Sequence, residues 1–231
     1  MRTVKLMLIL CSIGLMVLIV NGVGQEYKPV TQPPPKEVVE DASRFAISRK
    51  ISFLGKMKRA WQEVYVFEGD IEHIKVDAVT RQVTFVLYSR HKLATPKDRR
   101  INLEEAEEIA KSWLIERGVS LKGWILEERK FYDRYVFRWV KRSPKGVRLP
   151  CLMYVTVGID GTILSLLRIE RDVEVSLEPS ISAEKAMEIA LKAAELVQPK
   201  IIRWELCVWF NREGKQQLRW EWKIECQRSK S

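Results

Sequence analysis

Apolar residues recur along this chain with two different spacings, and the spacing changes from helical to strand-like three times. Spacings of three and four residues, typical of one face of an amphipathic helix, mark 103–114 and 186–197 and, less regularly, 38–46. The 38–46 helix has the option of running on toward Leu54. Alternating or continuous apolar runs after each helix predict β-strands. These strands are expected at 64–67, 71–77, 83–88, 132–141, 151–158, 162–169, 201–210 and 218–226.

The two regular helices repeat one another at an offset of 80 residues. Segments 101–110 and 181–190 carry identical residues at six positions, which are 101, 104, 106, 108, 109 and 110 in the first copy. Asn102 and Ser182 stand at N-cap positions, where a side-chain oxygen accepts a free backbone N–H. The repeated order predicts an α+β fold of tandem units, each a helix packed on an antiparallel β-meander, after an N-terminal signal or anchor helix.

Composition divides the chain into five segments. Residues 1–24 are expected to form a signal peptide or membrane anchor, and residues 25–36, which include four prolines, an extended tether. Three repeated units follow at 37–93, 101–170 and 181–227. The third unit is truncated, because only two strands follow its helix.

Two turn sequences complete the repeated pattern. Val-Gly-Ile-Asp-Gly at 157–161 predicts a hairpin, because Asp-Gly suits a tight turn. The segment 76–83 stands in the equivalent place, with Thr80 and Arg81 where a glycine would be expected.

The capped helix with Ala-x-x-x-Ala, the strands rich in Trp and Tyr and these turns together resemble the PepSY domain. Their tandem arrangement in an exported chain is similar to the YcdB/YcdC repeat family. The resemblance covers about residues 36–227. It implies an extracytoplasmic, non-catalytic module of a group linked to protease inhibition or cell-envelope association, and it implies no catalytic residues.

The amino terminus has the pattern of an export signal. A short basic segment precedes the apolar run Leu6–Val20, whose 15 residues would span about 22 Å as a helix, less than the roughly 30 Å of a bilayer core. Small residues up to Gly24 suit cleavage before Gln25, and the alternative is an uncleaved anchor. Both place the rest of the chain outside the cytoplasm, either secreted or held at the outer face of the membrane. Mass spectrometry of the native protein separates the two, since the first residue is Gln25 after cleavage and Met1 without it.

The chain is basic, with 40 Lys and Arg against 30 Asp and Glu and a net charge of +10. This excess favours anionic cell-wall polymers or lipid headgroups as contacts, and salt would weaken such contacts. A nucleic-acid partner is not expected, because no compact basic run with interleaved aromatic residues occurs and export removes the chain from nucleic acid.

The sequence contains no known catalytic motif, and we predict no catalytic residue, no cofactor and no metal site. A His-Glu-x-x-His pair, a Gly-x-Ser-x-Gly elbow and a phosphate-binding loop are all absent from the sequence. His73 and His91 have no neighbouring Cys or Asp cluster and are interpreted as surface imidazoles. The four glutamates of 104–108 are interpreted as a solvated helix face. The chain is therefore not expected to be an enzyme, and a site assembled from residues distant in sequence is the competing hypothesis.

Three cysteines lie beyond the signal segment, and an odd number leaves at least one thiol unpaired in a monomer. Cys151, Cys207 and Cys226 all fall in expected strands, and we interpret them as buried free thiols rather than as a disulfide framework.

Three tryptophans are candidates for contact with a partner. Trp209 is out of phase with the other apolar residues of 201–210, so an exposed Trp209 would mark a contact surface. Trp220 and Trp222 share one face of the last strand. Core packing beneath the third helix is the competing interpretation of most of the tryptophans, with Trp209 as the exception to test.

The third unit ends about one strand short, so its edge would carry unpaired backbone groups. Such an edge accepts an extended segment from a partner, a peptidase loop or a second copy of the chain, unless residues 227–231 cover it. We therefore expect an extracytoplasmic binding or regulatory module. Its partner would be a secreted peptidase, another envelope protein or an anionic cell-wall polymer, with membrane contact through the N-terminal helix if that helix is uncleaved. The alternative is a membrane-anchored structural or assembly protein of the cell envelope.

Overall fold

The computed structural model describes residues 27–28, 32–59, 62–89, 100–131, 133–194, 199–211 and 213–226. The expected signal or anchor segment 1–24 lies outside the described residues. In the expected tether, Tyr27–Lys28 forms the short strand β1 and pairs with residues 56–57. Among the described residues, no helix combines the length and the apolar character needed to cross a bilayer.

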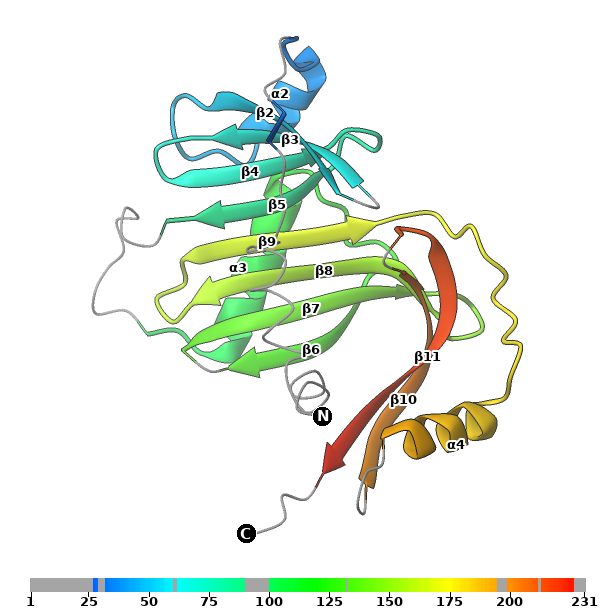
Figure 1. Ribbon diagram of the computed structural model, residues 1–231. Coiled ribbons are helices and arrows are strands. Elements are labelled where there is room, and N and C mark those ends of the chain that lie inside the picture. The colour runs from blue at the N-terminus through cyan, green and yellow to red at the C-terminus, as the bar shows by residue number, and fades with distance from the viewer. Residues whose placement is uncertain are drawn as a thin grey trace, which may run out of the picture.

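Three helices and eleven strands make up the described chain (Figure 1). The helices are α2 (Lys36–Ser43), α3 (Leu103–Glu116) and α4 (Ala183–Ala194). The strands of the first half, after β1, are β2 (Ser52–Arg59), β3 (Gln62–Glu68), β4 (Glu72–Asp77) and β5 (Val83–Tyr88). Those of the second half are β6 (Ile125–Phe131), β7 (Arg134–Arg142), β8 (Arg148–Gly158), β9 (Ile163–Glu170), β10 (Pro199–Phe210) and β11 (Gln216–Cys226).

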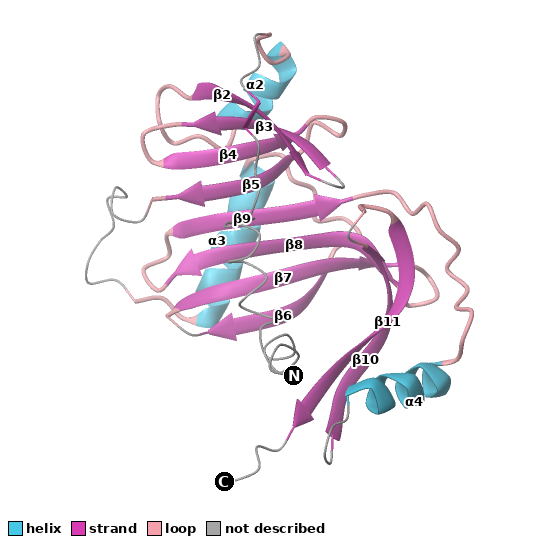
Figure 2. Ribbon diagram, in the orientation of Figure 1, coloured by secondary structure: helices cyan, strands magenta, loops and turns pink. Residues whose placement is uncertain are grey.

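All the strands belong to one sheet (Figure 2). Its order is β1-β2-β3-β4-β5-β9-β8-β10-β11, and β7 joins the sheet through β8 and carries β6 on its other side. The expectation of tandem units, each a helix on its own antiparallel meander, is therefore wrong. The reason is that β5 pairs with β9, with Val86 opposite Leu166. The edge strand of the first expected meander is therefore hydrogen-bonded to the second, and the two form one sheet. Pairing across that junction satisfies backbone groups that two separate meanders would leave at open edges.

The apolar core also runs across the expected unit boundary. Phe45, just after α2, meets Trp113 of α3 edge to face at 5.5 Å between ring centroids, and Tyr88 of β5 meets the same indole at 6.4 Å. The buried Tyr88 hydroxyl donates a hydrogen bond to the Phe45 carbonyl at 2.5 Å, and burial raises the pKa of Tyr88 to about 12. Figure 1 shows α3 lying across one face of the sheet, where its backbone lies closest to β7 and β8. Burial of each large apolar side chain contributes about 1.5–3 kcal/mol, so the shared core holds the two halves of the sheet together.

The first helix is shorter than the sequence allowed. It ends at Ser43, and the option of a helix running toward Leu54 is wrong because Leu54 lies in β2. In β2 the register shifts between Phe53 and Gly55, and the buried Gly55 has a φ of 142°. A side chain would rarely adopt that backbone conformation, so the glycine permits the bulge.

The capping and turn predictions are confirmed. The Asn102 side chain accepts the Glu105 backbone N–H at 2.8 Å, and the Glu105 carboxylate accepts the Asn102 N–H at 3.0 Å, which completes a capping box. The Ser182 hydroxyl accepts the Lys185 N–H at 3.3 Å. In the β8–β9 turn, Gly161 has a φ of 88°, while Arg81 takes a left-handed φ of 57° in the β4–β5 turn, where a glycine was expected.

Candidate binding site

The residues first considered for catalysis do not come together. His73 lies half-buried in β4 beside Phe85, and burial, followed by the charge of Lys75, lowers the pKa of its imidazole. His91 lies outside the described residues. Within the described ranges, no group of three or more His, Cys, Asp or Glu side chains could hold a metal ion.

The glutamates of α3 divide into two kinds. Glu104, Glu105 and Glu108 are exposed, as expected for a solvated helix face. Glu107 is buried instead, and its carboxylate lies 2.8 Å from the Lys111 ammonium and 2.7 Å from the Arg129 guanidinium. Because both of its oxygens are engaged by these cations, Glu107 joins α3 to β6 rather than forming a carboxylate pair for acid–base chemistry.

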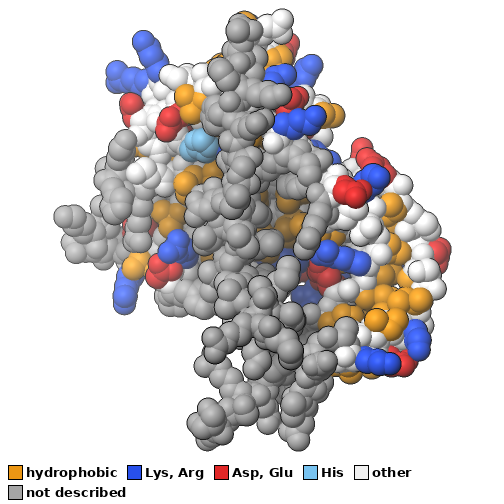
Figure 3. Space-filling view, in the orientation of Figure 1, with side chains coloured by type: hydrophobic (Ala, Val, Ile, Leu, Met, Phe, Trp, Pro, Cys, Tyr) orange, Lys and Arg blue, Asp and Glu red, His pale blue; other side chains and the backbone are white. Residues whose placement is uncertain are grey.

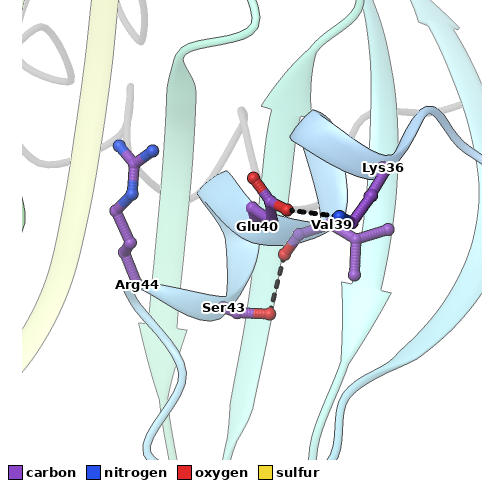
Figure 4. A pocket seen from close by; sticks show the side chains of 5 residues that line it. All are labelled: Lys36, Val39, Glu40, Ser43 and Arg44. Atoms are coloured by element: carbon purple, nitrogen blue, oxygen red, sulfur yellow. Dashed lines mark hydrogen bonds and ion pairs between the residues drawn. The ribbon is translucent and has the colours of Figure 1, made fainter.

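A shallow hollow on α2 is not a site for chemistry. Figure 4 shows its five lining side chains, four from α2 and the fifth from Arg44 just after it, with Arg44 pointing away from the others. Lys36 pairs with Glu40 at 3.5 Å, and the Ser43 hydroxyl donates to the Val39 carbonyl at 2.7 Å. These polar groups satisfy one another along the helix, and none converges on a point where a substrate atom could sit.

A second hollow, of about 420 Å³, is a groove between α4 and the β10–β11 hairpin. Its walls are mostly apolar, and the indole N–H of Trp220 donates to the Ile181 carbonyl at 3.2 Å across it. Figure 3 shows hydrophobic side chains gathered on the lower right, where α4 and this hairpin lie. The apolar and aromatic side chains that line the groove are Pro179, Ile181, Ala186, Ile189, Ala190, Leu206, Leu218, Trp220 and Trp222.

Two of the three tryptophans singled out from the sequence lie at this groove. Trp220 and Trp222 of β11 line it and surround Trp204 of β10, with ring centroids 5.3 Å and 5.8 Å from the Trp204 ring. Trp204 is 52% exposed and was missed by the sequence interpretation. The register of the β10–β11 hairpin would have identified Trp204, because it lies directly opposite Trp222.

Trp209, the third candidate, lies apart from this group. It is half-buried against the apolar cluster of Val140, Leu152 and Ile169. The Arg148 guanidinium lies 5.8 Å from its ring centroid, a distance typical of a cation–π contact.

Strand β11 forms one end of the sheet. In the described chain it pairs only with β10, over the full run from Gln216 to Cys226. The N–H and C=O groups that point away from β10 therefore lie along an edge that borders the apolar groove. Eleven residues is long for a strand that has no neighbour on one side among the described residues.

A network of buried charges holds the hairpin to the rest of the sheet. The Arg148 side chain on β8 is only 5% exposed, and its guanidinium lies 3.1 Å from Glu205 of β10 and also contacts Glu221 of β11. From β7, Arg142 donates to Glu205 at 2.6 Å and also contacts Glu127 of β6. Burial alone would raise the pKa of Glu205, but the charges of Arg148, Arg203 and Arg142 outweigh it and the pKa is lowered.

On the side away from β11, strand β10 shares little backbone pairing with β8, so the ion pairs supply contacts that the backbone does not. The parallel ladder between β8 and β10 has a single pair, Arg148 opposite Cys207. Side-chain ion pairs therefore add specific contacts between the hairpin and β6–β8 to those made by the backbone.

The cysteine prediction is confirmed where it is tested. Cys151 and Cys207 are free and buried, and the side chain of Cys226 lies outside the described part of the chain. Burial raises the pKa of both thiols, that of Cys207 to about 11. Since the thiolate is the reactive form, burial disfavours both sulfurs as nucleophiles.

Comparisons with known proteins add a likeness in fold. No protein-family model matches the chain, and no curated protein matches it. Among solved structures, it is similar to the Bacillus megaterium YpeB C-terminal domain, with a TM-score of 0.49 and 18% identity over 85% of this chain and 89% of that chain. Likeness at this level supports no statement about activity, substrate or partner. The assignment to PepSY-type domains, and more finely to the YcdB/YcdC repeat family, remains a prediction from the sequence motifs.

Proposed function

We propose that this chain is a non-catalytic, extracytoplasmic binding module of the PepSY type that takes an extended polypeptide segment as an additional strand along β11. One observation carries the proposal: the β11 edge runs beside an apolar groove within the described chain. In strand addition, main-chain hydrogen bonds supply affinity, and pockets for alternate side chains supply specificity.

The groove matches the side chains that an added strand would present. Alternate residues of an extended segment point to one face, and on the groove side they would meet Trp220, Trp222 and Ile189. Ile189 on α4 is 51% exposed, so a docked apolar side chain would remove nonpolar area from water. The partner is therefore a polypeptide with apolar residues at alternate positions, such as a loop of a secreted peptidase or of another envelope protein.

The location outside the cytoplasm rests on the sequence. The basic start and the apolar run Leu6–Val20 support export, and anchoring through an uncleaved segment would make the same module a membrane-held assembly element. Neither arrangement alters the strand addition proposed at β11.

A defined peptide tests this function. The probe is the capped nonapeptide Val-Lys-Val-Glu-Val-Lys-Val-Glu-Val, and its control carries proline at the central valine, which removes a backbone N–H. In titration calorimetry with the full chain in mild detergent, we expect the probe to bind at least ten-fold more tightly than the control.

A matched pair of variants locates the binding. Trp222→Thr, which removes a groove wall on β11, should weaken binding by about ten-fold, or about 1.4 kcal/mol. Ile125→Thr removes an exposed apolar side chain from β6, outside the groove, and should change affinity by less than about three-fold. Equal binding of the probe and its proline control, or binding of polyglutamate in place of the probe, would count against strand addition.

A further inference from the structure

The charge sequence of β11 is complementary to itself. Along the strand, Arg219, Glu221, Lys223 and Glu225 alternate in sign, and they are separated by Leu218, Trp220, Trp222, Ile224 and Cys226. When two copies of such a strand run antiparallel, the register decides whether like or opposite charges face each other. This inference rests on the proposed strand addition and names its partner.

We propose that the segment added beside β11 is β11 of a second copy of the chain, in a two-fold antiparallel pairing centred on Trp222. This register places Arg219 opposite Glu225 of the second copy and Glu221 opposite Lys223 of the second copy. The symmetry repeats each pair, so two pairs taken twice give four opposite-charge pairs. Trp222 lies opposite Trp222 of the second copy, and Trp220 lies opposite Ile224 of the second copy.

Neighbouring registers fit less well. Centring the pairing on Glu221 places that carboxylate opposite its own copy and Arg219 opposite Lys223, so like charges face each other. Centring it on Trp220 leaves only the Arg219–Glu221 pair, taken twice, among the charged residues of β11. The register centred on Trp222 has the most opposite-charge pairs of the three.

Across the hairpin, charges on β11 lie opposite like charges on β10, although Glu221 also contacts Arg148 of β8 and Arg219 of its own strand. Across the β10–β11 ladder, Arg203 lies opposite Lys223 and Glu205 lies opposite Glu221. Like charges directly opposite one another on a sheet are unfavourable. A second copy would place an opposite charge on the other side of Lys223 and of Glu221. The Arg219 and Glu221 side chains are 45% and 35% exposed, so both are accessible to it.

Charge reversal with rescue tests the pairing. Sedimentation of the full chain in mild detergent should show a dimer that dissociates on dilution. Arg219→Glu and Glu225→Arg each place two like-charge pairs in the interface, and each should raise the dimer Kd by about ten-fold or more. The double variant R219E/E225R restores opposite charges and should return the Kd to within about three-fold of the original.

The controls separate this interface from other effects. Lys215→Glu changes a charge that is 78% exposed, just before β11 and outside the proposed ladder, and should leave the Kd unchanged. Circular dichroism of each variant checks that its fold is intact. A chain that stays monomeric at all concentrations, or a double variant no better than the single ones, would overturn the pairing. If such a monomer still binds the alternating nonapeptide, only the second copy is lost as the partner; if it binds neither, the proposed function fails as well.

Discussion

Replacing Arg148 with methionine is expected to lower the free energy of unfolding by about 3 kcal/mol or more. The guanidinium is almost fully buried, and its removal leaves Glu205 and Glu221 without their shared cation. Glu205 would keep Arg142 and Arg203, and Glu221 would keep Arg219, but each carboxylate would lose its most buried cation while retaining the cost of leaving water. Methionine keeps a similar volume, so the loss reports charge rather than a cavity.

The matched control for this prediction is Arg203→Met. Arg203 contacts the Glu205 and Glu127 carboxylates at 3.2 Å from the edge of the network, with its side chain 37% exposed. A half-exposed ion pair contributes little, so this variant should lose less than about 1 kcal/mol. Urea unfolding of both variants gives the comparison, and equal losses would contradict the role assigned to Arg148.

Replacing Asp77 with alanine is expected to cost about 2–4 kcal/mol. The Asp77 carboxylate is fully buried at the β4–β5 turn, where it accepts the Val79 and Thr80 backbone N–H groups at 2.9 and 2.8 Å. It also accepts from Gln62 at 2.9 Å and pairs with Arg171, which follows β9. Its loss would therefore leave donors from three parts of the chain without an acceptor.

Asp160→Ala provides the control, because Asp160 occupies the corresponding β8–β9 turn. It is only half-buried, and its carboxylate accepts the Thr162 N–H at 3.0 Å. We expect this substitution to cost about 1 kcal/mol. Thermal unfolding monitored by circular dichroism would show the ranking, and a cost for Asp160→Ala at or above that for Asp77→Ala would contradict it.

The pH dependence of Asp77 follows from its surroundings. Burial raises the pKa of this carboxyl, but the Thr80 N–H, Arg171 and Gln62 outweigh it and the pKa is lowered. A lowered folded pKa stabilises the protein fully above the ordinary Asp value of about 4, and the contribution is lost as the pH falls through the lowered value. The stability difference between the natural chain and Asp77→Ala should therefore shrink below about pH 4.

Local patterns predicted local elements well. The α3 helix begins beside its expected cap because Asn102 and Glu105 carry the whole capping box within four residues. The expected strand 83–88 has the bounds of β5, since a short apolar run between turn residues needs no distant information. The β10–β11 hairpin also forms from the two strands expected at 201–210 and 218–226.

Strand β6 could not be predicted in the same way. Its sequence contains Glu127, Glu128 and Arg129, which do not resemble a buried strand. Glu127 is nevertheless only 8% exposed, because Arg142 and Arg138 from the neighbouring strand balance its charge. Such compensation joins residues distant in the sequence, and no local pattern records it.

The continuity of the sheet was hidden for a related reason. The β5–β9 pairing joins residues about 80 positions apart, and an internal repeat favours separate units as readily as one sheet. The binding groove was only partly visible from the sequence. Trp220 and Trp222 stood out by their alternation in one strand, but Trp204 and the position of α4 depend on the folded hairpin.

Hydrogen–deuterium exchange at β11 tests the central claim most directly. The full chain is held at low concentration, with and without the alternating nonapeptide in large excess, and exchange of β11 amides is compared with that of β6, which in the described chain pairs only with β7. The account predicts that the peptide slows exchange along β11 by at least ten-fold and leaves β6 unchanged. Unchanged exchange in β11, or equal slowing in β6, would contradict the claim that β11 is the edge that receives another strand.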